Sequence, residues 1–206
     1  MGANAKFWDR ISAKYARDPI KNVEAYERKI TATQALMTPD MTVLEIACGT
    51  ATTALRHAPH VHHIRATDLS GKMLAIARDR ARDAGVENIT FEQSSLEDLL
   101  VEDGSVDMVL AMSILHLLDD HQAGIAKVWR MLRPGGHFIS STTCMRDAAN
   151  WFRFIAPLGN ATGLLPLVRF FTRSDLEDSI RQAGFEITES WAPDPKAAVF
   201  IIAQKP

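Results

Sequence analysis

From residue 42 onward the sequence alternates between short apolar runs and longer amphipathic stretches, and this alternation most limits the fold. Apolar runs of four to eight residues are typical of buried strands, and the stretches between them have the periodicity of helices. Strands that alternate with helices predict strand–helix–strand units, which build a mostly parallel sheet. The predicted strands cover residues 42–46, 63–67, 89–93, 106–112, 137–142, 186–190 and 197–204.

Two of the predicted helices have recognisable ends. Ser70 is placed to cap a helix over 72–83, and Gly85 follows its last turn. The segment from Ser174 to Glu177 has the spacing of a capping box, and the helix that it opens should end at Gly184.

Two further segments lie outside the alternation. Residues 8–37 are predicted to be helical with a break at Asp18, because the residue before a proline avoids the α region, and they form an N-terminal cap over about 1–38. Residues 151–171 are rich in Trp, Phe, Leu, Gly and Pro, and we interpret about 146–173 as a lid or insertion. The whole chain, 1–206, is expected to be one domain.

Composition excludes several classes of protein. The chain is 47% hydrophobic and 23% charged, which is ordinary for a globular protein. A net charge of −2 argues against a nucleic-acid partner, because phosphate binding needs clustered Lys and Arg. Two cysteines are too few for a disulfide framework, and no apolar run is long enough to span a bilayer. We therefore expect a cytoplasmic protein without a transmembrane segment.

The most informative segment runs from Val43 to Leu55, where a strand leads through small residues into a helix. Small residues let a ligand approach the backbone closely. About twenty residues later Asp68 ends the second strand, where a carboxylate can accept hydrogen bonds from ribose hydroxyls. This order predicts a nucleoside site, although small residues in such a turn can also serve only to pack a helix against a strand.

Five segments together resemble the class I family of methyltransferases that depend on S-adenosylmethionine (SAM), especially its ubiquinone and menaquinone biosynthesis branch. They are Glu45-x-Ala47-x-Gly49-x-Ala51, Asp68-Leu69-Ser70 with Met73, Phe91 to Leu96, Ser105 to His116, and Leu132 to Phe138. The resemblance implies an α/β fold with a Rossmann-like seven-stranded, mostly parallel sheet. The implied strand order is 3-2-1-4-5-7-6, with the last strand antiparallel and helices on both faces.

The same resemblance implies SAM as cofactor and S-adenosylhomocysteine as its product. With two cysteines and no ligand spacing among the histidines, we expect no metal. The cofactor-binding residues that the resemblance implies are Tyr15, Glu45, Ala47, Gly49, Asp68, Leu69, Met73, Ser95, Leu96 and Met112. For Tyr15, an aromatic residue that only packs the N-terminal helix on the sheet is the alternative.

This sequence departs from the family at three of its positions. Ala47 and Ala51 replace loop glycines; we expect Ala47 to fit a turn with negative φ, and Ala51 to serve close packing through its small size. Ser95 stands where relatives often have an aspartate that accepts from the adenine amino group, so affinity should be lower unless Glu97 compensates.

Histidines offer two candidate sites. His116, just after the fourth predicted strand, is the candidate catalytic base if the acceptor must lose a proton; a histidine near the cofactor without a proton-transfer role is the alternative. The cluster of His57, His60, His62 and His63 lacks thiolates and carboxylates at ligand spacing, so we interpret it as a solvated edge rather than a metal site.

The predicted lid carries the information on the acceptor. Its aromatic residues could line a pocket for an apolar acceptor, lie on a membrane surface or belong to the core: Trp151, Phe152, Phe154, Phe170 and Phe171. Its arginines suit either an anionic end of the acceptor or a solvated basic face: Arg146, Arg153, Arg169 and Arg173.

We therefore predict SAM-dependent methyl transfer to a small acceptor that is at least partly apolar, lipid-like acceptors included. The alternative is a SAM-binding regulator or pseudo-enzyme that transfers no methyl group. A nicotinamide dinucleotide site is disfavoured, because the loop lacks a Gly-x-Gly-x-x-Gly pattern. The acceptor, its nucleophilic atom and the oligomeric state are left open by the sequence.

Overall fold

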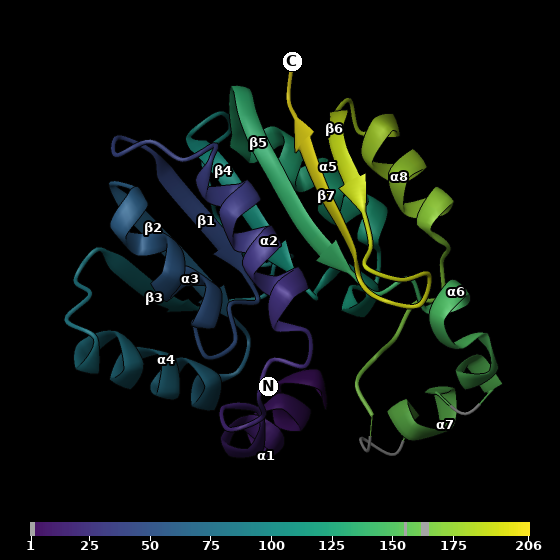
Figure 1. The fold of residues 1–206 in the computed structure, drawn as a ribbon. Coiled ribbons are helices and arrows are strands. Elements are labelled where there is room, and N and C mark those ends of the chain that lie inside the picture. Colours follow the sequence, from purple (N-terminus) through teal and green to yellow (C-terminus); the bar gives the residue numbers. More distant parts are fainter. Residues whose placement is uncertain (1–2, 155, 162–164) are drawn as a thin grey trace. The chain divides into compact units, whose positions relative to one another are not determined.

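The computed structural model describes residues 3–154, 156–161 and 165–206 (Figure 1). The chain forms two compact units, Met1–Leu99 and Leu100–Pro206. The strands have the order β3-β2-β1-β4-β5-β7-β6 in a seven-stranded sheet. This confirms the predicted fold class and strand order. The single domain with an N-terminal cap and a lid stays a prediction.

The first unit holds three parallel strands and the helices between them. Its elements are α1 (Ala3–Tyr15), α2 (Val23–Gln34), β1 (Thr42–Ile46), α3 (Thr52–His57), the 3₁₀ turn η1 (Ala58–His60), β2 (His63–Asp68), α4 (Gly71–Asp83) and β3 (Ile89–Gln93). β2 pairs with β1 on one side and with β3 on the other, in parallel. α4 packs beside β2 and β3.

β1 is the most deeply buried strand of this unit together with the end of β2. Val43, Leu44 and Ile46 are almost completely buried, as expected of a strand covered on both faces. Each such side chain stabilises the fold by about 1.5–3 kcal/mol relative to an exposed one. β3, at the edge, has no fully buried residue. The carboxyl ends of β1 and β2 are therefore held on a rigid base, and the loops that follow them form the candidate site.

The second unit holds the other four strands. Its elements are β4 (Val106–Met112), the 3₁₀ turn η2 (Leu115–Leu117), α5 (His121–Met131), β5 (Leu132–Thr142), α6 (Met145–Ala149), the 3₁₀ turn η3 (Asn150–Phe154), α7 (Ala156–Ala161), α8 (Arg173–Gln182), β6 (Glu186–Trp191) and β7 (Val199–Gln204). β4 and β5 are parallel, whereas β7 runs antiparallel to both β5 and β6, which confirms the predicted antiparallel last strand.

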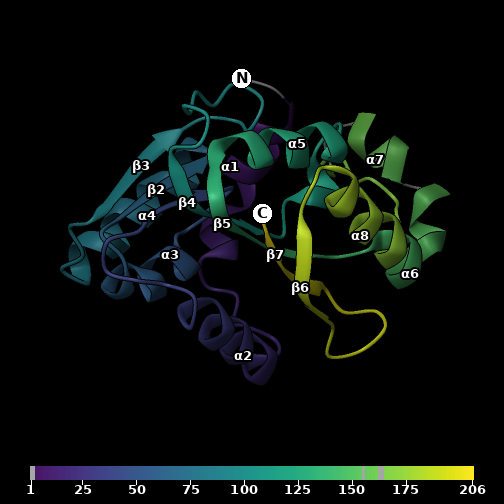
Figure 2. The same ribbon diagram turned by 90° about the horizontal axis from the view of Figure 1, so that it is seen from above.

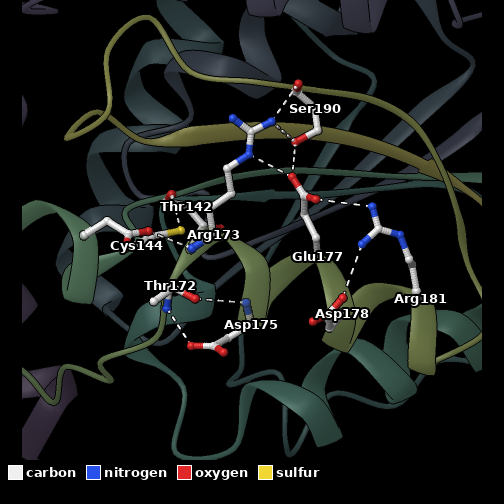
Figure 3. A network of polar contacts seen from close by, with 10 residues as sticks. Thr142, Cys144, Thr172, Arg173, Asp175, Glu177, Asp178, Arg181 and Ser190 are labelled. Atoms are coloured by element: carbon white, nitrogen blue, oxygen red, sulfur yellow. Dashed lines mark hydrogen bonds and ion pairs between the residues drawn. The ribbon is translucent and has the colours of Figure 1, made fainter.

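The start of α8 differs from the prediction. The capping residue is Thr172 rather than Ser174: its Oγ1 accepts from the Asp175 amide at 3.1 Å, and the Asp175 carboxylate accepts from the Thr172 amide at 2.8 Å (Figure 3). Ser174 also has an acidic residue three positions later, but the Glu177 carboxylate accepts from Arg173 and Ser190 instead. Asp175 is the residue that completes the reciprocal pair, with Thr172. The helix ends near Gly184, as expected, where φ is +102°.

The two segments outside the alternation are mostly helical. The N-terminal cap is α1 and α2, and the break between them includes the predicted Asp18–Pro19. The predicted lid contains α6, η3 and α7, which can be followed in Figure 2; residues 155 and 162–164 of the lid lie outside the described ones. Within the described parts of the chain, no helix is long and apolar enough to cross a membrane.

Candidate cofactor site

The loop between β1 and α3 has a backbone of unusual handedness. Ala47, Gly49 and Ala51 all have positive φ, at +52°, +56° and +61°. The Cys48 amide donates to the Thr67 carbonyl at 2.9 Å, and the Gly49 amide donates to Asp68 Oδ2 at 2.9 Å. The loop is thereby fixed to the end of β2.

The left-handed alanines correct our expectations for both positions. Ala47 does not occupy a negative-φ turn, and Ala51 is left-handed as well as small. An L-residue with a Cβ is disfavoured in this region by about 1–2 kcal/mol, because the Cβ approaches the following carbonyl oxygen. The loop therefore keeps the backbone that glycines would give it, at a cost in stability.

Relieving this strain should have different effects at the two alanines. Ala47→Gly is expected to raise the free energy of unfolding by about 1 kcal/mol, because the Ala47 side chain is only half-buried. Ala51→Gly should change it little, because the relief is offset by about 0.8 kcal/mol for the lost methyl of a completely buried side chain. Urea unfolding of the three proteins measures this, and an Ala47→Gly variant less stable than the parent would contradict it.

Asp68 braces the loop and the start of α4 at the same time. Its Oδ2 accepts from the Gly49 amide, and its Oδ1 accepts from the Ser70 amide at 2.8 Å. Burial raises the pKa of Asp68, and these two bonds oppose that rise. A carboxylate has about four acceptor positions, so both oxygens can still accept from further donors.

Glu45 is the most unusual ionisable residue of this unit. Its side chain is 1% exposed, and its Oε2 has no hydrogen-bond partner among the described residues. Burial, together with the charge of Asp68, raises the pKa of Glu45 to about 8, although a bond from the Ala54 amide opposes this. A buried carboxyl with one unused oxygen suits a donor or a cation that the protein itself does not supply.

Tyr15, at the end of α1, lies against this loop. A Cβ added to Gly49 would lie 3.6 Å from Cε1 of the Tyr15 ring. Burial and the nearby carboxylates of Asp68 and Glu45 raise the pKa of Tyr15, yet 48% of its surface is exposed. The structure thus brings Tyr15, Glu45, Gly49 and Asp68 together, and a ring so exposed contributes little to the core.

Two residues that fix α1 in place were missed by the sequence analysis. Asp9 Oδ1 accepts from the Ser70 hydroxyl at 2.6 Å and from the Lys72 amide at 3.1 Å. The Arg80 guanidinium donates to the Ala16 carbonyl at 2.6 Å and to Thr50 Oγ1 at 2.8 Å. The sequence holds no signal for Arg80, because Arg78 and Arg82 on the same helix have the same local context.

The other predicted cofactor residues of this unit lie on the elements that follow β2 and β3. Met73 is buried in the first turn of α4, and the carbonyl of Leu69 accepts from the Gln93 side chain. Ser95 donates to Asp98 at 2.9 Å and accepts from its amide, so its hydroxyl already serves a local turn. Leu96 beside it is buried.

In the second unit, Met112 and His116 follow one another through a strained turn. Met112 is the last residue of β4 and lies opposite Ser141; the next residue, Ser113, has a φ of +62°. His116 lies in η2, its carbonyl accepts from the Arg169 amide at 2.8 Å, and its buried Nδ1 has no partner among the described residues. Burial lowers the pKa of His116 to about 4, so the ring is neutral near pH 7 and able to accept a proton.

The histidine cluster is only partly a solvated edge. His57 is completely buried, and neither ring nitrogen has a partner in the described structure, which corrects the prediction for this residue. His60 is exposed, and His63 Nε2 lies 2.9 Å from Thr90 Oγ1. The described residues contain no group of three potential metal ligands.

Replacing the buried histidine should stabilise the protein against acid. Burial lowers the pKa of His57 to about 4, so its contribution is present above the ordinary value of 6.5 and is lost as pH falls toward 4. His57→Leu is expected to raise the free energy of unfolding by about 1–2 kcal/mol at pH 7, because an unpaired buried polar group is removed, and by more at pH 5. Unfolding titrations at both values test this, with the exposed His60→Gln as control; equal pH dependence of parent and His57→Leu would contradict it.

The predicted lid joins the second unit through a polar network (Figure 3). Arg173 donates to Glu177 Oε1 and to Ser190 Oγ, both at 2.8 Å. Burial alone would raise the pKa of Glu177, but bonds from Arg173, Ser190 and Arg181 outweigh it and lower the pKa. Arg169 pairs with Asp119 at 3.1 Å. These two arginines therefore have structural partners in the protein.

The aromatic residues of the lid divide into two groups. Phe171 is buried, with its ring 4.6 Å from that of His121, which fits the core interpretation. Trp151 and Phe154 are 67% and 74% exposed, and Arg153 lies over the Phe154 ring. The side chain of Phe152 lies outside the described ones.

Several known proteins are similar to this chain in sequence or in fold. Residues 43–136 match the family model of a methyltransferase domain. An uncharacterised methyltransferase of Bacillus subtilis, YcgJ, is 32% identical over 97 residues, which are 47% of this chain and 38% of YcgJ. The crystal structure of a SAM-dependent methyltransferase from Mesorhizobium loti is 20% identical and has a TM-score of 0.70 over 84% of this chain and 96% of that one.

Residues 43–136, slightly less than half of the chain, therefore match a methyltransferase domain, as predicted from the sequence. The fold shared with the Mesorhizobium loti structure agrees with this domain. A demethylmenaquinone methyltransferase of Listeria welshimeri is 24% identical to this chain over 168 residues, which are 74% of this chain and 70% of the relative. The matched family segment begins at the first strand of the candidate site and includes Glu45, Gly49, Asp68 and His116.

Proposed function

We propose that this protein transfers the methyl group of SAM to a small acceptor that is at least partly apolar. The observation that carries the proposal is the group formed by Glu45, Gly49 and Asp68. A buried carboxyl with an unused oxygen, a left-handed glycine and a braced aspartate meet at the ends of β1 and β2. In open α/β sheets, ligands bind at the carboxyl ends of the strands.

The residues present fit SAM, which supplies the reactive methyl group when it is bound. Asp68 would hold the ribose hydroxyls with the acceptor positions that its two backbone bonds leave over. Gly49 would let the ligand approach the backbone. The unused Oε2 of Glu45 would accept a hydrogen bond from the amino group of the methionine moiety. Met73, Leu69, Ser95 and Leu96 would surround the adenine.

The acceptor class is proposed from the lid and from one relative. Trp151 and Phe154 expose large aromatic surfaces beside Arg153. The Listeria relative is named for demethylmenaquinone, and a quinone ring would suit such an aromatic surface. We therefore place ring-bearing, partly apolar acceptors first among the candidates.

His116 would remove the proton of the acceptor. Because burial lowers its pKa to about 4, the ring is in its basic form across the physiological range, and kcat/KM should fall only below about pH 5. His116→Gln is expected to lower kcat by about 10²–10⁴ and to abolish this acid limb. A pH profile of kcat/KM for both proteins measures it; an unchanged kcat would assign His116 a role without proton transfer.

Binding and turnover together test the proposed function. Calorimetry with SAM and with S-adenosylhomocysteine comes first, followed by release of S-adenosylhomocysteine in the presence of hydroxylated quinones and phenols of increasing apolar length. Binding of both nucleosides with turnover of a member of this panel supports the proposal. Binding without turnover of any acceptor favours the regulator or pseudo-enzyme, and absence of binding overturns both.

A further inference from the structure

We propose that Arg80 is a positioning residue that joins α1 to the loop 47–51 and thereby controls how fast the cofactor leaves. This inference rests on the proposed function, since it concerns the same site. Arg80 lies in the last turn of α4, outside the loop 47–51, and its side chain is half-buried.

The guanidinium of Arg80 connects three elements of the first unit. One nitrogen, Nη1, donates to Thr50 Oγ1 at 2.8 Å, to the Thr50 carbonyl at 3.3 Å and to Thr52 Oγ1 at 3.1 Å. The other, Nη2, donates to the Ala16 carbonyl at 2.6 Å. Thr50 directly follows Gly49, and Ala16 directly follows Tyr15. One planar group therefore fixes the neighbours of two proposed cofactor residues relative to each other.

The opposite part of α1 is attached independently. Asp9 accepts from the Ser70 hydroxyl and the Lys72 amide at the start of α4, whereas Arg80 lies ten residues further along the same helix, roughly 15 Å away at 1.5 Å per residue. α1 is thus held along α4 at two points. Release of the Arg80 point alone would free Tyr15 and leave the Asp9 attachment intact.

The position of Tyr15 explains why this attachment matters for the cofactor. Its ring lies where a Cβ of Gly49 would contact it, and 48% of its surface is exposed, so packing alone does not hold it. A ligand that approaches the Gly49 backbone would lie against this ring. Arg80 would then reduce the number of orientations that Tyr15 adopts before the ligand arrives, which raises affinity without new contacts to the ligand.

The test compares Arg80→Ala with Arg82→Ala, a matched variant on the same helix whose exposed guanidinium pairs with Asp79 and Asp83. Arg80→Ala is expected to weaken SAM and S-adenosylhomocysteine about tenfold, chiefly through faster dissociation in stopped-flow displacement, while kcat at saturating SAM stays within twofold. Arg82→Ala should match the parent in all three. Arg80→Lys should fall between, because an ammonium cannot bond both sides in the same plane.

A second variant and a second measurement separate positioning from stability. Asp9→Ala releases the second attachment, in the middle of α1, without touching the loop, and it should also speed dissociation. Tryptic cleavage after Lys14 and Arg17 should be slowed by SAM in the parent and much less in Arg80→Ala. Equal dissociation rates for the parent, Arg80→Ala and Arg82→Ala would overturn the inference alone. Failure of the unaltered protein to bind SAM would overturn the inference together with the proposed function.

Discussion

Replacing Glu45 by glutamine is expected to stabilise the cofactor-free protein and to weaken its binding of SAM. The carboxyl of Glu45 has its ordinary pKa of 4.5 in the unfolded chain, and its pKa rises to about 8 in the buried site. Its contribution to stability is therefore complete below pH 4.5 and is lost as pH rises through 8. At pH 8 the glutamine variant should be more stable by roughly 4 kcal/mol, since the pKa rises from 4.5 to about 8 and each unit of pKa corresponds to 1.36 kcal/mol.

The same substitution should lower SAM affinity roughly 10- to 100-fold, because a charge-assisted bond to a cationic amino group is worth about 1.5–3 kcal/mol. Ionisation of Glu45 on binding predicts that the affinity of the parent rises with pH up to about 8 and that the variant loses this part of the rise. Thermal unfolding and calorimetry between pH 6 and 9 measure both effects, with the exposed Glu87→Gln as control. A variant that is less stable than the parent at pH 8 would refute the assignment of a strained, buried carboxyl.

The second large effect is expected from a single methyl group at Gly49. Gly49→Ala should reduce SAM affinity at least tenfold, because the added Cβ would occupy the approach to the loop beside Tyr15. Alanine is the informative substitution: at a φ of +56° a β-branched residue would also distort the backbone.

Gly85→Ala provides the matched control for this experiment. Gly85 has a φ of +65°, and a Cβ there would meet nothing within 4 Å. Both variants should lose about 1 kcal/mol of stability from the left-handed conformation. Only Gly49→Ala should lose affinity in a calorimetric titration with SAM. Equal affinities in the two variants would place the cofactor elsewhere.

The predicted strands agree closely with the structure, because strand patterns depend on burial and the pattern is written in the apolar residues. β1, β3 and β4 have the predicted bounds, and β2 extends one residue further, to Asp68. β5 begins at Leu132 rather than at 137, since its first residues, Arg133 to Gly136, are polar or small and have no apolar pattern. The predicted start of α8 was wrong, because Thr172 and Ser174 both have a hydroxyl and an acidic residue three positions later, and Thr172 is the capping residue.

The parts of the site that sequence could not reveal depend on backbone conformation and distant contacts. Periodicity carries no information about φ, so the left-handed state of Ala47 and Ala51 was not foreseen. Burial of His57 depends on neighbours far along the chain, and a cluster of histidines resembles a solvated edge whether or not one of them is covered. Asp9 and Arg80 act through partners about sixty residues away, and no local pattern marks such contacts.

The base of the lid has a consequence for how substrate preference could change. The Arg146 amide donates to the Phe171 carbonyl at 3.2 Å, and the Arg173 amide donates to Asp147 at 2.8 Å, so the two ends of the segment are fastened to each other. When the ends of an insertion are fixed, doubling its length costs only about 0.6 kcal/mol. Residues 148–168 can accordingly be exchanged as a cassette that keeps the bonds of Arg169 to His116 and Asp119, and new acceptor preferences could evolve or be engineered there.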